Sequence, residues 1–160
     1  MVAPMDYKTV TSVMESWEKV RRMNDYLDVV GPKLYTKFFT LEPEAMPVLG
    51  FPKTMDPTCE KIQSSGRFRA HSKFFVQLLD RALDMLGPAD DVLTDILVEL
   101  GKDHKKMGVK PTFFAPLGTA LIQVLEEELP ASDFDEDTKG AWMEVYTALS
   151  SDLIKSITSA

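Results

Sequence analysis

Cysteine, histidine and long apolar runs are all scarce in this sequence of 160 residues. The one cysteine, Cys59, excludes a disulfide bond within the chain. No apolar run reaches the roughly eighteen residues that a membrane-spanning helix needs. The N-terminal MVAPMDYK also lacks the basic and apolar regions of a secretory signal. We therefore expect a protein of the reducing cytoplasm with no membrane partner.

Positive charge is also scarce, since 18 basic residues face 25 acidic ones and the formal net charge is −7. An acidic surface repels phosphate backbones and anionic lipids, so this composition disfavours nucleic acid and membrane surfaces as partners. The glycine patterns of nucleotide-binding loops are absent as well. The sequence thus supplies no nicotinamide or flavin site of its own.

What the sequence has in abundance is helical periodicity. Hydrophobic residues make up 44% of the chain and recur at intervals of three and four, whereas no alternating strand pattern persists. The strongest apolar stripe runs from Arg67 to Leu86, and a second leads through Leu93 and Leu97 to His104. No linker or repeat divides the chain. We predict an all-α fold in one domain, residues 1–160, with about seven to eight helices.

The starts of three helices are expected from their capping residues and prolines. Ser12, followed three residues later by a glutamate, indicates a capping box or an early first turn. Pro32 suits the first position of the second helix, because its fixed φ angle is already helical. The last helix is predicted over about residues 135–157, with Ser132 or Asp133 as its cap.

Loops and helix ends are expected where glycine, proline and small polar residues gather. Residues 52–66 are polar and aperiodic, which predicts a loop with at most a short helix. Gly87, followed by a proline, and Gly108 are expected to end two helices. Pro116 lies too deep in the segment before Leu129 for an unbroken helix, so we expect a kink there or a helix start after it.

Both histidines, His71 and His104, lie on the apolar stripe of a predicted helix. A buried neutral imidazole must satisfy both ring nitrogens, and a metal ion can take one of them. Two imidazoles without carboxylates or thiolates nearby make a poor zinc site. A haem needs only axial ligands, because the porphyrin supplies the four equatorial nitrogens. On this pattern alone, a haem-free helical scaffold with two structural histidines stays as an alternative.

The segments around both histidines resemble those of globins, and most of all the neuroglobin type. Five matches occur in the right order along the chain: Trp17 where the first helix carries its tryptophan, LYTKFFTLEPEAMPVL in the second and third helices, RFRAHSKFF in the distal helix, ELGKDHKKMGVK at the proximal histidine and AWMEVY in the last helix. The resemblance covers about residues 10–157. It implies the globin fold, in which helices surround a haem pocket.

The resemblance also implies a role for each matching residue. The cofactor would be haem b, bound non-covalently, since no C-x-x-C-H motif is present for covalent attachment. His104 would be the proximal iron ligand, with its other ring nitrogen bonded to the Leu100 carbonyl. His71 would be the distal histidine, and Tyr35 would reach a bound ligand. The other residues expected against the haem are Leu49, Phe51, Phe75, Leu100, Val109, Phe114 and Leu117.

Two positions depart from the globin pattern. The phenylalanine that globins place six residues after the proline of the third helix is replaced by Leu49, with Phe51 two residues later, so either side chain is a candidate to pack on the haem. Phe75 stands where a smaller aliphatic residue is usual, and it should narrow ligand access. Two arrangements of His71 stay open: it hydrogen-bonds a bound ligand, or it coordinates the iron until a ligand displaces it.

Reversible binding of O2, NO and CO is the function that the resemblance implies, in a monomer or a homodimer. It leaves open an NO dioxygenase or peroxidase-like redox enzyme served by a separate reductase, and a gas sensor acting through a separate partner. No catalytic residue is assigned. Four lysines surround the proximal histidine in an otherwise acidic chain, and they are candidates for docking an acidic redox partner, for neutralising haem propionates, or for a merely solvated face: Lys102, Lys105, Lys106 and Lys110.

Overall fold

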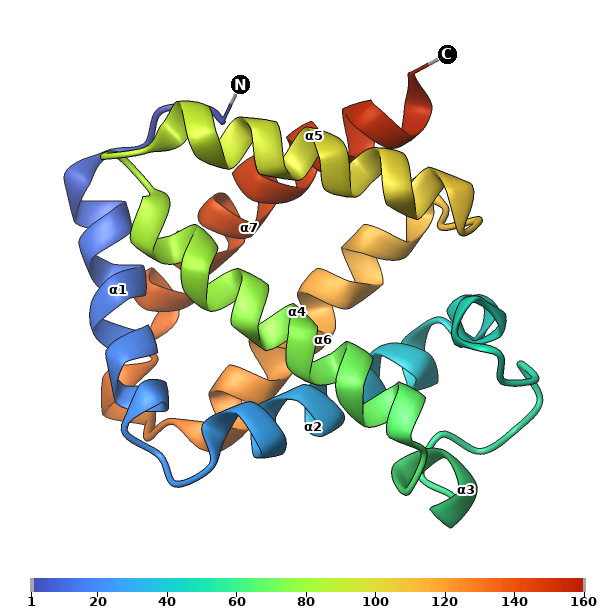
Figure 1. Ribbon diagram of the computed structural model, residues 1–160. Helices are drawn as coiled ribbons and strands as arrows, with labels where there is room; N and C mark the ends of the chain where they lie inside the picture. Colours follow the sequence, from blue (N-terminus) through green and yellow to red (C-terminus); the bar gives the residue numbers. More distant parts are fainter. Residues whose placement is uncertain (1, 160) are drawn as a thin grey trace.

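The computed structural model describes residues 2–159, and within them the chain is entirely helical with no strand (Figure 1). The predicted all-α class is therefore confirmed. None of the described helices is both long enough and apolar enough to cross a membrane. The elements in order are α1 (Tyr7–Arg21), α2 (Tyr26–Leu41), the 3₁₀ helix η1 (Pro43–Leu49), α3 (Glu60–Gln63), α4 (Gly66–Met85), α5 (Asp90–Lys106), the 3₁₀ helix η2 (Pro111–Phe113), α6 (Phe114–Glu128), the 3₁₀ helix η3 (Ala131–Asp133) and α7 (Glu136–Thr158).

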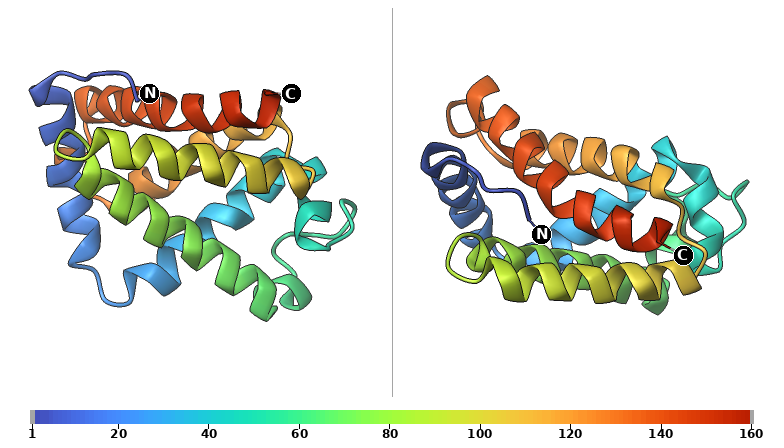
Figure 2. Two further views of the ribbon diagram at one scale, coloured as in Figure 1. Left: turned by 45° about the horizontal axis from the view of Figure 1, so that its top comes forward. Right: turned by 90° about the horizontal axis from the view of Figure 1, so that it is seen from above.

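The helices pack in crossing pairs around one continuous core. α2 packs against both α4 and α6, and α5 lies alongside α7 (Figures 1 and 2). α1 packs against α7 at the end of the molecule away from η1 and α3. Trp17 and Trp142 anchor this end, with their rings edge to face and 5.7 Å between centroids. The two helices that carry the histidines, α4 and α5, are thus each held against a partner helix.

Glycines allow those two helices to approach their partners closely. A Cβ atom at Gly31 on α2 would lie 2.7 Å from the carbonyl oxygen of Ser72 on α4. A Cβ atom at Gly101 on α5 would lie 2.5 Å from the Cβ of Ser156 on α7. Both contacts are too short for any larger residue, so these glycines set how near the histidine-bearing helices come to the rest of the fold.

The predicted start of the first helix and the predicted cap of the last helix were wrong, whereas the last helix does begin near residue 135 as predicted. α1 begins at Tyr7, where the Asp6 carboxylate accepts a hydrogen bond of 2.7 Å from the Lys8 N–H, and Ser12 lies within the helix. α7 begins after Asp135, whose carboxylate accepts from the Thr138 N–H at 2.9 Å. Aspartate caps a helix as well as serine does, and each aspartate has helical residues directly after it.

Pro32 and Pro116 both lie inside helices, and neither marks the start of its helix. α2 begins at Tyr26, six residues before Pro32, so the predicted start at Pro32 was wrong. Burial of the turn that contains Val30 and Gly31 outweighs the backbone hydrogen bond that Pro32 cannot donate. α6 begins at Phe114, two residues before Pro116, rather than after it. In a first turn the N–H that proline lacks has no helical partner in any case.

The loop and helix-end predictions were confirmed. The polar stretch 52–66 contains the short helix α3 and the first residue of α4. Gly87 follows α4 with a φ angle of +88°, and Gly108 follows α5 with +83°. Only glycine adopts these left-handed values without strain, so each glycine ends its helix.

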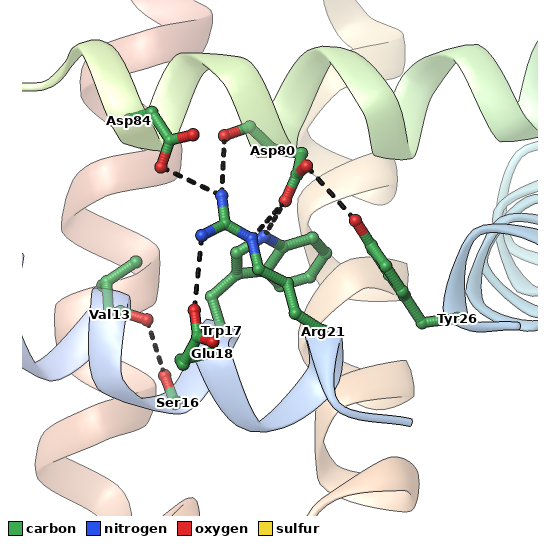
Figure 3. A network of polar contacts seen from close by, with 8 residues as sticks. All are labelled: Val13, Ser16, Trp17, Glu18, Arg21, Tyr26, Asp80 and Asp84. Atoms are coloured by element: carbon green, nitrogen blue, oxygen red, sulfur yellow. Dashed lines mark hydrogen bonds and ion pairs between the residues drawn. The ribbon is translucent and has the colours of Figure 1, made fainter. Parts of the chain in front are cut away.

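A network of polar contacts ties α1 to α4 (Figure 3). The Asp80 carboxylate accepts hydrogen bonds from Trp17 Nε1 at 2.7 Å, from Arg21 Nε at 2.6 Å and from the Tyr26 hydroxyl at 3.2 Å. Arg21 also contacts the Asp84 carboxylate at 2.9 Å. Partial burial alone would raise the pKa of Asp80, but the bonds from Trp17, Arg21 and Tyr26 outweigh it, so the pKa lies below its usual value.

Replacing Asp80 with alanine should lower the free energy of unfolding by about 2 kcal/mol at neutral pH, because the buried Trp17 N–H loses its acceptor. A group whose folded pKa is depressed stabilises above its unfolded pKa of about 4. The stabilisation is lost as the pH falls below that value, so the difference from wild type should shrink in acid. Urea unfolding at several pH values measures it. Asp84→Ala is the control, since its side chain is 59% exposed and should contribute less than about 1 kcal/mol. A difference that does not change with pH would contradict the charge-based explanation.

Candidate functional site

A cavity with almost entirely apolar walls lies between α2, η1, α4, α5 and α6. The interior of the cavity has a volume of about 190 Å³. All the space between its walls, including the part open to solvent, amounts to about 940 Å³. The walls come from elements far apart in the sequence, and α4 and α5 place the two histidines in them. The lining residues are Tyr35, Phe38, Phe39, Ala45, Val48, Leu49, His71, Phe74, Phe75, Leu78, Leu100, His104, Met107, Val109, Phe113, Phe114, Leu117 and Leu153.

His104 is fixed by its own helix. Its Nδ1 lies 2.7 Å from the carbonyl oxygen of Leu100, one turn earlier on α5. A carbonyl oxygen only accepts hydrogen bonds, so Nδ1 must carry a hydrogen, and in the neutral imidazole Nε2 is then the nitrogen with the lone pair. Because His104 lines the cavity, this arrangement makes its Nε2 the nitrogen that is available to a metal ion.

His71 lies in the facing wall, on α4. Burial lowers the pKa of its imidazole, and the nearby His104 lowers it further, so the ring is neutral at neutral pH. Within residues 2–159 neither ring nitrogen of His71 has a hydrogen-bond partner. Its one ring contact is with Tyr35, edge to face, with centroids 5.3 Å apart and an angle of 78°. A neutral imidazole with no partner is suited to coordinate a metal ion or to donate to a ligand.

Tyr35 brings a second polar group into the cavity wall. Its side chain is 5% exposed, and its hydroxyl has no hydrogen-bond partner among the described residues. Burial raises the pKa of the phenol, which therefore stays protonated and remains a donor. Because Tyr35 lines the cavity, its hydroxyl is available as a hydrogen-bond donor to a group bound there.

Phe75 forms the rear of the cavity, one turn after His71. Its ring packs edge to face on Tyr35 with 5.9 Å between centroids. A smaller apolar cavity of about 70 Å³ adjoins the first and shares five lining residues with it: Phe75, Leu78, Phe114, Leu117 and Leu153. The Tyr146 ring closes this second space, and its hydroxyl donates to the Phe114 carbonyl at 2.6 Å. Phe75 is thus one of the side chains that border both apolar spaces, and its narrowing of ligand access stays a prediction.

The cavity brings together nine of the ten residues that the resemblance assigned to the haem. Phe51 is the one outside: it packs against the core, whereas Leu49 lines the cavity. Periodicity placed Phe68 and Leu78 on the same stripe as His71, but only Leu78 reaches the cavity. Among the lining residues that the sequence did not single out for the haem, Phe38 and Phe39 follow Tyr35 by one turn of α2, a spacing that could have revealed them.

The walls fit a haem. A porphyrin needs flat apolar faces and one strong axial ligand, and the cavity offers apolar side chains with a single oriented nitrogen at His104. Tyr35 on α2 and His71 on α4, whose polar side-chain atoms have no partner among the described residues, line the same cavity from other helices than His104 does. Within residues 2–159 no cluster of three or more histidine, cysteine or acidic side chains forms another metal site.

Comparison with known proteins gives a consistent result. The sequence model of the family described as Globin matches residues 32–153. A neuroglobin of Tetraodon nigroviridis is 29% identical over 121 residues, which are 74% of this chain and 73% of that protein. Among solved structures, a globin of Drosophila melanogaster superposes with a TM-score of 0.78, 22% identity and 94% of both chains covered. The last likeness shows the fold alone.

Proposed function

The chain belongs to the globin family, and on that premise we propose that it is a haem b protein that binds O2, NO and CO reversibly. The observation that carries the proposal is the bond from His104 Nδ1 to the Leu100 carbonyl, which leaves Nε2 facing the cavity as an axial ligand. Haem iron supplies the reversible bond to the gas. The chain supplies the ligand that holds the iron, the apolar walls that exclude water, and the donors on the distal side.

His71 serves as the internal sixth ligand when no gas is bound. Three features support this: its imidazole is neutral, its ring nitrogens have no partner among the described residues, and it lines the same cavity as His104 from a different helix. A gas must then displace His71, so the apparent affinity falls by the fraction of iron that is open. Displaced from the iron, His71 joins Tyr35 as a hydrogen-bond donor.

A redox enzyme is the second candidate, for example an NO dioxygenase served by a separate reductase. Lys105, Lys106 and Lys110 lie at and after the end of α5 and form no ion pair with a carboxylate among the described residues, which favours an acidic protein partner for this role. The two functions differ in turnover. A binding protein consumes one NO per oxygenated molecule, whereas an enzyme continues for as long as a reductant restores the ferrous state.

The absorption spectrum of the reduced protein under argon tests the proposal. We expect the visible spectrum of a six-coordinate ferrous haem, converted by CO to that of a carbonyl complex. His71→Leu removes the sixth ligand but leaves His104 in place, so its ferrous spectrum should be five-coordinate. CO should also bind this variant faster, without the lag of displacement. An identical six-coordinate spectrum in the variant would rule out His71 as the ligand, and a protein without any haem band would rule out the proposed function itself.

A further inference from the structure

Two large apolar side chains stand at the mouth of the pocket. Phe74 on α4 is 66% exposed and Met107, directly after α5, is 51% exposed, yet both line the cavity. A residue that lines a cavity and is more than half exposed must lie at its opening. Phe74 and Met107 therefore form the rim of the mouth on its α4 and α5 sides.

Unneutralised positive charge lies beside this mouth. Lys105 and Lys106 end α5, Lys110 follows the turn at Gly108, and all three are exposed. Within the described residues no carboxylate pairs with any of them, although the Lys105 ammonium contacts the Ser159 carbonyl. Most lysines on the other helices do form ion pairs, namely Lys19, Lys33, Lys37, Lys73 and Lys139. Lys8, Lys61 and Lys155 form no ion pair among the described residues either, but they lie on three separate helices, whereas Lys105, Lys106 and Lys110 lie within six residues of one another.

We propose that the mouth surface, defined as Phe74, Lys105, Lys106, Met107 and Lys110, docks an acidic protein that donates single electrons. The proposal rests on the proposed function, because the acceptor is the haem whose edge this mouth would leave open. One electron leaves the redox centre of the donor and enters the ferric haem, and no covalent bond forms or breaks. The acidic donor is thereby oxidised by one electron, and the globin returns to the ferrous state that binds O2.

The arrangement of the mouth surface fits a transient protein interface. Phe74 and Met107 provide an apolar centre, and the lysines provide a charged rim that speeds encounter with a partner of opposite charge. An anionic membrane fits less well. A planar bilayer would face the acidic remainder of the chain as well as the lysines, whereas a compact acidic patch on a protein meets the lysines alone. At physiological salt, interactions between charges more than about 8 Å apart are screened, so the contact between the lysines and a facing acidic patch counts for more than the net charge of the chain.

Titration of the holoprotein with an acidic [2Fe–2S] ferredoxin as the probe tests the proposal, with binding followed by calorimetry and by NMR. We expect saturable binding at about 20 mM salt that weakens tenfold or more at about 300 mM. The double variant Lys106→Glu with Lys110→Glu should weaken binding by a similar factor. It should also slow reduction of the ferric protein by the reduced probe in parallel, with an unchanged absorption spectrum.

A matched control changes the net charge equally at a distance from the mouth. Lys8 and Arg22 are exposed at the two ends of α1, on the opposite side of the molecule from the end of α5, and neither forms an ion pair within the described residues (Figure 1). Lys8→Glu with Arg22→Glu should bind the ferredoxin probe like wild type, apart from a small effect of net charge.

Three results would overturn the docking proposal. The first is that the ferredoxin probe does not bind, or that it binds equally well to the double variant at Lys106 and Lys110 and to the control double variant at Lys8 and Arg22. Another is binding to phosphatidylserine vesicles that only the Lys106 and Lys110 variant loses, which would make the lysines a membrane surface. The third is faster haemin loss to an apoglobin acceptor with probe binding unchanged, which would assign the lysines to the haem propionates. Each differs from failure of the proposed function, because the same samples would still show the haem spectrum.

Discussion

Replacing His104 with glycine should remove the protein's hold on haem, with a loss of haemin affinity of about 100-fold or more. His104 supplies the one oriented nitrogen in the proximal wall, fixed by its bond to the Leu100 carbonyl. The other residues that line the cavity are apolar apart from Tyr35 and His71, so they would hold a porphyrin mainly through apolar contacts. Haemin transfer to an apoglobin acceptor measures the loss as a faster dissociation rate than in wild type.

Free imidazole separates the loss of a ligand from a loss of folding. Glycine leaves space for a small base, so added imidazole should restore a wild-type-like spectrum to the His104→Gly protein. Circular dichroism should report an unchanged helix content. His71→Leu is the matched control, since it removes the other histidine of the cavity and should retain haem. Equal haemin retention by wild type and His104→Gly would mean that iron is held elsewhere.

Replacing Tyr35 with phenylalanine should speed O2 dissociation by about 10- to 100-fold. The hydroxyl of Tyr35 is buried, protonated and without a protein partner, so a ligand in the cavity is the acceptor available to it. A hydrogen bond to a group that takes on negative charge contributes about 1.5–3 kcal/mol, which corresponds to one to two decades in rate if it acts on dissociation. Stopped-flow displacement of O2 by CO measures the rate.

Two comparisons isolate the hydroxyl of Tyr35. Tyr146→Phe removes a partly buried phenol, but that hydroxyl already donates to the Phe114 carbonyl, so O2 dissociation should change little. CO accepts hydrogen bonds more weakly than O2, so Tyr35→Phe should affect CO dissociation much less. Equal acceleration of both gases would instead point to a steric effect, and an unchanged O2 rate would show that Tyr35 does not reach the ligand.

The fold could be predicted from the sequence wherever a local pattern decides the outcome. The apolar stripes predicted α4 and α5 correctly, and Gly87 and Gly108 predicted where these helices end. Both signals depend only on residues that are close together in the sequence. The start of α2 could not be predicted this way. Pro32 suits a helix start locally, but tertiary packing of Val30 and Gly31 extends the helix beyond it.

The cavity shows the same limit. Both histidines and Tyr35 were found through a match of whole segments, which carries three-dimensional information that spacing alone lacks. Whether Leu49 or Phe51 lines the cavity depends on the path of the backbone after η1. There Gly50 adopts a φ angle of +83° and turns the chain, so that only Leu49 lines the cavity. The exposure of Phe74 could not be predicted either, since its position relative to the mouth depends on how α4 packs against α2.

Titration of the purified, haem-free protein with haemin tests the central claim most directly. The account predicts a sharp absorption band that saturates at one haemin per chain, with a midpoint that shifts strongly in His104→Gly. Absorption that rises without saturation, or that saturates equally in both proteins, would contradict a cavity built around the nitrogen of His104.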